Sequence, residues 1–359
     1  MKKIAAYILA LTICLLSSCD VHEWPEATIG TRLNLHLNFD TQLPQIIHPY
    51  SERAAKEDNS SVLTQGYMQY IVRLYPVSES GVTSLQPTQE WVFGQDVAGG
   101  YDLDTYIDVE PGNYEIMVWS HILFNKDATS FYDPTSFSEI LLQQHQANTD
   151  YRDGFRGKEQ VRVEASISEQ LPQDIQVQMQ RPMAKFEFVT TDLKIFIERE
   201  INRMAVANRA NPLQYEDILR GLGDYNVTFN YVGYMPDAFS IFTDRPVDSS
   251  TGMHFQSRLT KLNNDEASMG FDYVFTNGKE TAVTLQIQVT DRQGTQLSLT
   301  KPIEVPIKRS HHTIVKGAFL TATASGGIFI DPSYNGDHNV MLRDEEATED
   351  NPDYEIDIE

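Results

Sequence analysis

Apolar and polar residues alternate in many short stretches of this chain. In the clearest stretch, Leu33, Leu35, Leu37 and Phe39 alternate with polar residues. Alternation with a period of two is typical of strands that bury one face. The same pattern predicts further strands at 70–75, 114–118, 161–167, 175–179, 186–188, 227–231, 283–289 and 303–307. Many short strands separated by turns favour an all-β fold built from antiparallel sandwiches.

Two stretches depart from this pattern. Residues 41–66 contain two prolines and little periodicity, which predicts a long loop. Between Asp192 and Arg209 the apolar residues recur at helical spacing, and Asp192 is a suitable N-cap. We therefore expect one helix in the second half, packed against a sheet, although contact with a partner is an alternative role for it.

Pro182 falls between two predicted strands and suggests where the chain divides. We place a domain boundary there, between the strands predicted at 175–179 and 186–188. An N-terminal β-sandwich domain at 33–181 and a C-terminal one at 182–331 then have about 150 residues each, an ordinary domain size.

The first residues resemble a secretory signal that ends in a lipidation site. A basic Met1-Lys2-Lys3 precedes an apolar run from Ile4 to Leu16, which is too short to span a membrane. Leu16-Ser17-Ser18-Cys19 then reads as a lipobox, so residues 1–18 are predicted to be a lipoprotein signal peptide, Cys19 to carry the lipid, and 19–32 to form a tether. An ordinary secretory signal with a chance cysteine is the alternative.

Charge and cysteine content narrow the function classes. The chain carries 28 Lys+Arg against 51 Asp+Glu, a net charge of −23, which argues against nucleic acid as a partner. Its two cysteines, Cys14 and Cys19, both lie near the N-terminus, so the body has no disulfide or cysteine nucleophile. A nucleophile elbow, a zinc-binding histidine pair and a phosphate-binding glycine loop are all missing from the sequence. We therefore expect no enzyme activity, no cofactor and no metal.

The C-terminal residues 332–359 form an acidic extension. Nine acids and no Lys or Arg occur at 344–359, which is typical of a solvated tail. Nevertheless Tyr354, Ile356 and Ile358 alternate with acids, as in a strand with one face to bury. These three residues are the candidate partner contact. A self-complementing last strand, a frayed tail and a solubilising spacer are the alternatives.

Other residues have a chemistry that we interpret as structural. Two groups of residues carry carboxylate and amide oxygens that could bind calcium, but neither has the spacing of a calcium-binding loop. We therefore favour a role in capping loops for Asp102, Asp104 and Asp108, and for Asp331, Asn335 and Asp337. Neighbouring His311 and His312 point to opposite faces of a strand, so we interpret them as surface and edge residues.

Aromatic residues offer a possible glycan contact. Trp119 and His121 share one strand face and could stack a sugar, but a core position is favoured for them. Trp24 and Trp91 lie near the tether and in a loop, where glycan binding and local packing are both open.

Four segments together resemble a known family. They are the lipobox ending at Cys19, the strand and turn at Ile107–Trp119, the segment Arg181–Phe186, and the strand pair at Val305–Thr321. In these segments the chain resembles the fimbrillin-type lipoproteins of type V pili, in particular the minor-fimbrium anchor branch. It departs from the family pattern at Ser310, where the family has Asn.

The resemblance implies a fold and a role. The implied fold is two tandem transthyretin-like antiparallel β-sandwich domains, with the helix inserted in the second. The implied protein is held on the outer membrane by its lipid, with palmitate among the acyl chains, and acts in cell adhesion as a fimbrial anchor or fimbrillin-like subunit. It assembles with other fimbrial subunits or surface proteins by adding a strand to a sheet edge. A surface lipoprotein that binds glycan through a β-sandwich is the alternative.

Overall fold

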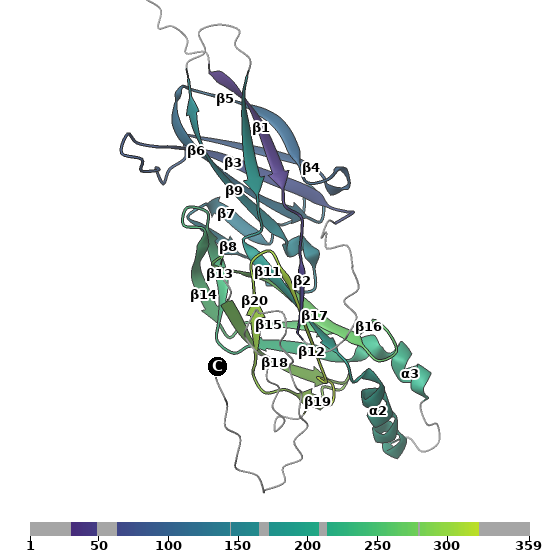
Figure 1. Ribbon diagram of the computed structural model, residues 1–359. Coiled ribbons are helices and arrows are strands. Elements are labelled where there is room, and N and C mark those ends of the chain that lie inside the picture. Colours follow the sequence, from purple (N-terminus) through teal and green to yellow (C-terminus); the bar gives the residue numbers. More distant parts are fainter. Residues whose placement is uncertain are drawn as a thin grey trace, which may run out of the picture.

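The fold is mainly β and contains two sandwiches in tandem (Figure 1). The computed structural model describes residues 30–48, 63–143, 145–164, 172–207, 214–278 and 281–322. The mainly antiparallel β architecture predicted from the alternation is confirmed. In the described chain, the ladders of β1 with β10, of β11 with β21 and of β2 with β21 are parallel.

The first sandwich packs a three-stranded sheet on a four-stranded one. The sheet orders are β10-β1-β5 and β4-β3-β6-β9. Their strands are β1 (Thr31–Phe39), β3 (Tyr67–Pro76), β4 (Gln89–Asp96), β5 (Leu103–Val109), β6 (Gly112–Leu123), β9 (Gly154–Val163) and β10 (Gln173–Met179). Leu33, Leu35 and Leu37 of β1 are buried between the sheets, as their alternation predicts.

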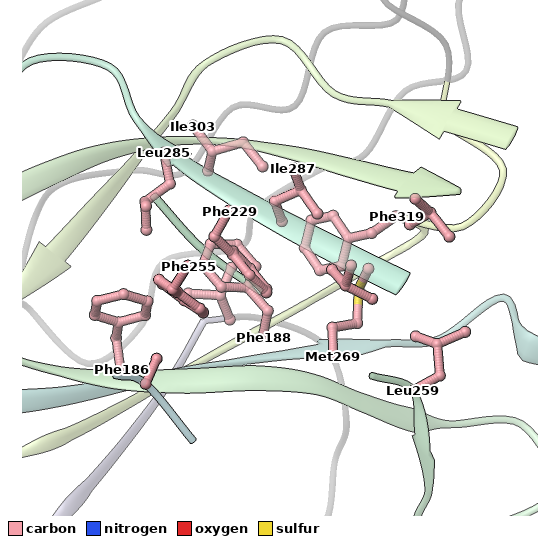
Figure 2. Close-up of a cluster of buried hydrophobic side chains, with 14 of the residues drawn as sticks. Phe186, Phe188, Phe229, Phe255, Leu259, Met269, Leu285, Ile287, Ile303 and Phe319 are labelled. Carbon is pink, nitrogen blue, oxygen red and sulfur yellow. The ribbon is translucent and has the colours of Figure 1, made fainter. Parts of the chain in front are cut away.

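The second sandwich packs two larger sheets. Their orders are β16-β17-β11-β21-β2 and β15-β12-β18-β19, with β20 also paired to β18. The strands are β2 (Gln45–His48), β11 (Met183–Thr190), β12 (Asn226–Tyr231), β15 (His254–Arg258), β16 (Thr260–Lys261), β17 (Ala267–Phe275), β18 (Thr281–Thr290), β19 (Gln296–Leu299), β20 (Ile303–Ile307) and β21 (His312–Gly317). Figure 2 shows the core between them, in which the rings of Phe229 and Phe255 stack with centroids 4.5 Å apart.

The predicted helix is present as α2 (Leu193–Ala207). Leu193, Phe196 and Ile197 are buried in the core of the second sandwich, which confirms its packing role. The backbone oxygen of Asp192 accepts the first helical N–H, from Phe196, at 2.9 Å, while the Asp192 carboxylate binds the backbone N–H and hydroxyl of Thr321. This aspartate thus ties the helix start to the segment after β21. A second, short helix, α3 (Tyr215–Arg220), was not predicted.

A smaller sheet, β14-β13-β8-β7, joins the two halves of the sequence. It consists of β7 (Tyr132–Ser136), β8 (Glu139–Leu142), β13 (Tyr234–Ser240) and β14 (Arg245–Thr251). β8 thus pairs with β13 of the other half, and β2 likewise pairs with β21. The predicted loop at 41–66 is therefore wrong at residues 45–48, because β2 is too short to show periodicity and its burial depends on a distant strand. The domain boundary at Pro182 stays a prediction.

An apolar interface holds the sandwiches together. It is a third buried cluster, drawn from both halves of the chain: Ile71, Tyr75, Met117, Trp119, Tyr132, Phe137, Ile140, Met183, Phe239, Ile241, Tyr273 and Phe275. Trp119 packs edge-on against Tyr132 with ring centroids 5.3 Å apart, and Phe239 stacks on Phe275. Close packing across this interface predicts that the sandwiches move as one body.

The described chain enters and leaves at opposite poles. β1 ends beside the junction, where the guanidinium of Arg181 donates to the backbone oxygens of Asp40 and Gln42. Thr31 therefore lies a strand length, about 25 Å, away from the junction. β11 runs away from the junction, and Thr321 binds the residue before α2 at its far end. Figure 1 shows this elongated arrangement.

Candidate functional site

The predicted contact residues at both ends of the chain lie outside the described residues. These are Cys19 at the N-terminus and Tyr354, Ile356 and Ile358 at the C-terminus. Trp24 and the set Asp331, Asn335 and Asp337 also lie outside them. The lipid anchor and the terminal strand therefore stay predictions.

Trp119 and His121 belong to the core, as favoured. Their exposed fractions are 0% and 1%, so neither ring can stack on a sugar. Both ring nitrogens of His121 are buried without a hydrogen-bond partner, and burial lowers the pKa of His121 to about 4. Trp91 lies on the strand β4, so its placement in a loop is wrong, and it is partly buried against the core of the first sandwich, which agrees with local packing.

The prediction of loop capping is wrong for Asp104 and Asp108, because both lie on the strand β5, whereas Asp102 lies just before it. Asp102 accepts the N–H of Phe39 at 2.8 Å, Asp104 lies 2.7 Å from Nδ1 of His36, and Asp108 lies 3.1 Å from Nε of Arg32. The hydrogen bond that His36 donates to Asp104 raises the pKa of His36. In the described part of the chain, no three or more His, Cys, Asp or Glu residues are grouped so as to hold a metal ion.

The prediction that His312 is a surface or edge residue is wrong. Its exposed fraction is 8%, and its Nε2 lies 3.2 Å from Oε2 of Glu187. β21 has β11 on one side and β2 on the other, and β2 was not expected from the sequence. Although burial opposes it, the contacts with His312 and Ser268 lower the pKa of Glu187.

A buried ionic centre connects the first half of the chain to β17. The carboxylate of Asp272, with an exposed fraction of 0%, binds the guanidinium of Arg152, the hydroxyl of Tyr231 at 2.7 Å and Nε2 of His145 at 3.1 Å. Arg152 also donates to the backbone oxygen of Tyr273 at 2.8 Å. Burial alone would raise the pKa of Asp272, but Arg152 and the other donors lower it.

A second buried pair, Arg181 with Asp153, also lies at the junction. Nε of Arg181 donates to Asp153 at 2.8 Å, and its guanidinium lies 4.7 Å from the ring centre of Phe155. Burial raises the pKa of Asp153 although Arg181 opposes the shift. Because both ion pairs are enclosed and join separate segments of the chain, we assign them a structural role. The sequence offered one signal for them, the charged run at 150–153.

A solvent-facing groove of about 830 Å³ lies beside the ionic centre. Three separate segments form it: residues 145–148, the strand β15 with residues up to 262, and the outer side of β11 and β17. Its lining consists of His145, Gln146, Ala147, Asn148, Lys185, Glu187, His254, Phe255, Gln256, Ser257, Arg258, Thr260, Leu262, Ser268, Gly270 and Phe271. Sequence reasoning missed it, because these segments are distant in the chain.

The groove is pre-formed by backbone and side-chain hydrogen bonds. The N–H of Asn148 donates to the backbone oxygen of Phe271 at 3.0 Å, and Oδ1 of Asn148 accepts the N–H of Phe271 at 2.8 Å. Nδ2 of Asn148 also donates to the backbone oxygen of Gln256. Gly270, with φ +142°, has no space for a side chain, since a Cβ there lies 2.7 Å from Oγ of Ser257. Asn148 thus connects β17 to β15 and fixes the groove walls.

Comparisons with known proteins give a family and a general likeness. A model for a family of unknown function (DUF6562) matches residues 30–357, and no curated protein matches the chain. Similar solved structures include a candidate adhesin from Bacteroides ovatus, 12% identical with a TM-score of 0.40, covering 77% of this chain and 82% of that one.

Two further similar structures come from Porphyromonas gingivalis. The fimbrial anchor protein Mfa2 is 12% identical with a TM-score of 0.35, covering 75% of this chain and 82% of its own. The tip fimbrial protein Mfa3 is 11% identical with a TM-score of 0.35, covering 77% of this chain and 81% of its own. At these identities and TM-scores, no residue of this chain can be assigned a role from the similar structures. Among the described residues, no helix has the length and apolar character needed to cross a membrane.

Proposed function

The chain belongs to DUF6562, a family of unknown function, and from its own residues we propose that it is a lipid-anchored structural protein of the cell surface, held on the outer membrane. The observation that carries the proposal is the sequence Leu16-Ser17-Ser18-Cys19 directly after a short apolar run. Acylation of Cys19 anchors such a protein, because each buried acyl CH₂ contributes about 0.8 kcal/mol and several chains together hold it firmly.

The arrangement of the sandwiches supports a load-bearing role. The described chain begins at one pole and ends at the other, and the junction between them is closed by an apolar cluster and two buried ion pairs. Two sandwiches joined in this way would hold a lipid at the N-terminal pole apart from a partner at the C-terminal pole. No catalytic step is part of this proposal.

We further propose that the partner is another surface subunit, as in a fimbrial anchor or fimbrillin-like subunit, and that it is joined by strand addition. The adding strand is the alternating segment with Tyr354, Ile356 and Ile358. Backbone hydrogen bonds to a free sheet edge supply affinity in such pairing, and alternate side chains fill pockets.

Two sets of variants test the proposal. Cys19→Ala in the full chain is expected to shift the protein from the membrane fraction to the soluble fraction. The triple variant Tyr354→Ser, Ile356→Ser and Ile358→Ser keeps every charge of the tail and is expected to remain on the membrane but to lose cross-linking to its partner.

The matched control removes charge instead of apolar side chains. Substituting Gln for Glu355 and Asn for Asp357 keeps the three apolar residues, so cross-linking is expected to persist. Unchanged fractionation of Cys19→Ala contradicts the anchor, whereas unchanged cross-linking of the serine variant contradicts strand addition alone.

A further inference from the structure

The groove beside β15 has the composition of a binding site for an uncharged, hydroxyl-rich ligand. Exposed side-chain amides come from Gln146 and Gln256, and hydroxyls from Ser257 and Ser268. Planar amides donate and accept hydrogen bonds at the same time, which suits neighbouring hydroxyl groups. The half-buried ring of Phe271 also lines the groove and carries Nζ of Lys185 over its ring.

Two charged groups in the groove, Lys185 and Glu187, already have side-chain partners, while Arg258 donates to the backbone oxygen of Gly223 at 3.0 Å. Nζ of Lys185 donates to Asp150 at 2.8 Å and lies 4.0 Å from the ring centre of Phe271. Glu187 accepts the hydroxyl of Ser268 at 2.7 Å and lies beside His312. A ligand that binds through Lys185 or Glu187 would have to break these pairs, and the net charge of −23 opposes the approach of an anionic ligand.

The size and rigidity of the groove suit an oligomeric ligand. Its volume of about 830 Å³ lies in the upper range of ligand sites. The five residues of β15 give one wall a length of about 15 Å, room for several sugar units. Because Asn148 fixes the walls before any ligand binds, little ordering entropy is lost on binding.

From these observations we propose that the groove lined by Asn148, His254, Gln256 and Phe271 binds a neutral polysaccharide. The side-chain amides of Gln146 and Gln256 pair with sugar hydroxyls. The proposal is independent of lipid attachment and of the terminal strand, because all groove residues lie at 145–271.

The test is affinity gel electrophoresis of the full-length protein in non-ionic detergent. The gels contain yeast mannan, dextran, galactomannan or xyloglucan as neutral probes, and polygalacturonate as the acidic one. We expect at least one neutral probe to slow the wild-type protein and the acidic probe to leave it unaffected.

Variants locate the binding surface. The double variant His254→Ala/Gln256→Ala alters two exposed side chains and is expected to weaken the binding about tenfold. Gln173→Ala, an exposed glutamine on β10 of the first sandwich, is the matched control and is expected to bind as the wild type does. Failure of every neutral probe to slow the protein, slowing by polygalacturonate alone, or full binding by the double variant overturns the proposal.

Discussion

Replacing the buried His121 with leucine should remove an acid-sensitive step from the stability of this protein. His121 lies on β6 with an exposed fraction of 1%, and neither of its ring nitrogens has a hydrogen-bond partner. Burial holds its pKa at about 4 in the folded chain, against 6.5 in an unfolded one. The folded state therefore binds fewer protons than the unfolded state between these pH values.

The sign and the magnitude follow from this difference in proton binding. Because the folded pKa is depressed, the contribution of His121 to stability is complete above pH 6.5 and is lost as the pH falls toward 4. Between pH 7.5 and 4.5 the loss amounts to about 2.5 kcal/mol of unfolding free energy. His121→Leu has a similar volume and no polar atom to bury, so it should equal or exceed the wild type at pH 7.5.

Urea unfolding at a series of pH values measures this effect. The unfolding free energy of His121→Leu, relative to the wild type, should rise by about 2.5 kcal/mol between pH 7.5 and 4.5. His36→Gln is the control, because the raised pKa of His36 gives the opposite sign: its contribution is present below pH 6.5 and is lost as the pH rises through the folded pKa. Parallel pH profiles for His121→Leu and the wild type would refute the reasoning.

Two further predictions concern the junction and the groove. Arg181→Met leaves the carboxylate of Asp153 buried without its cation, so the unfolding free energy in urea should drop by about 3–5 kcal/mol; a drop below about 1 kcal/mol would contradict a tightly closed junction. Gly270→Ala should destabilise the protein more than Gly294→Ala, which also has a positive φ but open space around its Cα and should cost about 1–2 kcal/mol. Equal thermal unfolding midpoints for these two glycine variants would show that the groove wall can yield.

The elements predicted well are those whose burial is visible in their own sequence. β1 and β18 alternate strictly, and their apolar residues are buried in the two cores. The spacing of Leu193, Phe196 and Ile197 likewise marked the face of α2 that packs on the second sandwich. In such elements local pattern and tertiary packing agree, so the sequence alone is sufficient.

The elements missed are those whose burial depends on distant partners. β2 has four residues, and it is a strand because β21 supplies its backbone hydrogen bonds. β8 becomes part of a sheet through β13, about a hundred residues later in the chain. His312 was misplaced for the same reason, since β2 converts an edge into a sheet interior.

The candidate sites also differ in whether the sequence alone reveals them. Cys19 and the segment with Tyr354, Ile356 and Ile358 are recognisable as linear motifs, which sequence reasoning handles well. The groove is not a linear motif, because Asn148, Gln256 and Phe271 come together only through sheet pairing. The groove can therefore be recognised only once the pairing of the strands is known.

The mass of the N-terminal peptide of the mature protein, isolated from native envelopes, tests the lipid-anchored role most directly. We expect a mature chain that begins at Cys19 and carries a thioether-linked diacylglycerol together with an acyl group on its α-amine. A mature chain whose Cys19 is unmodified, or one that still carries residues 1–18, would contradict this role.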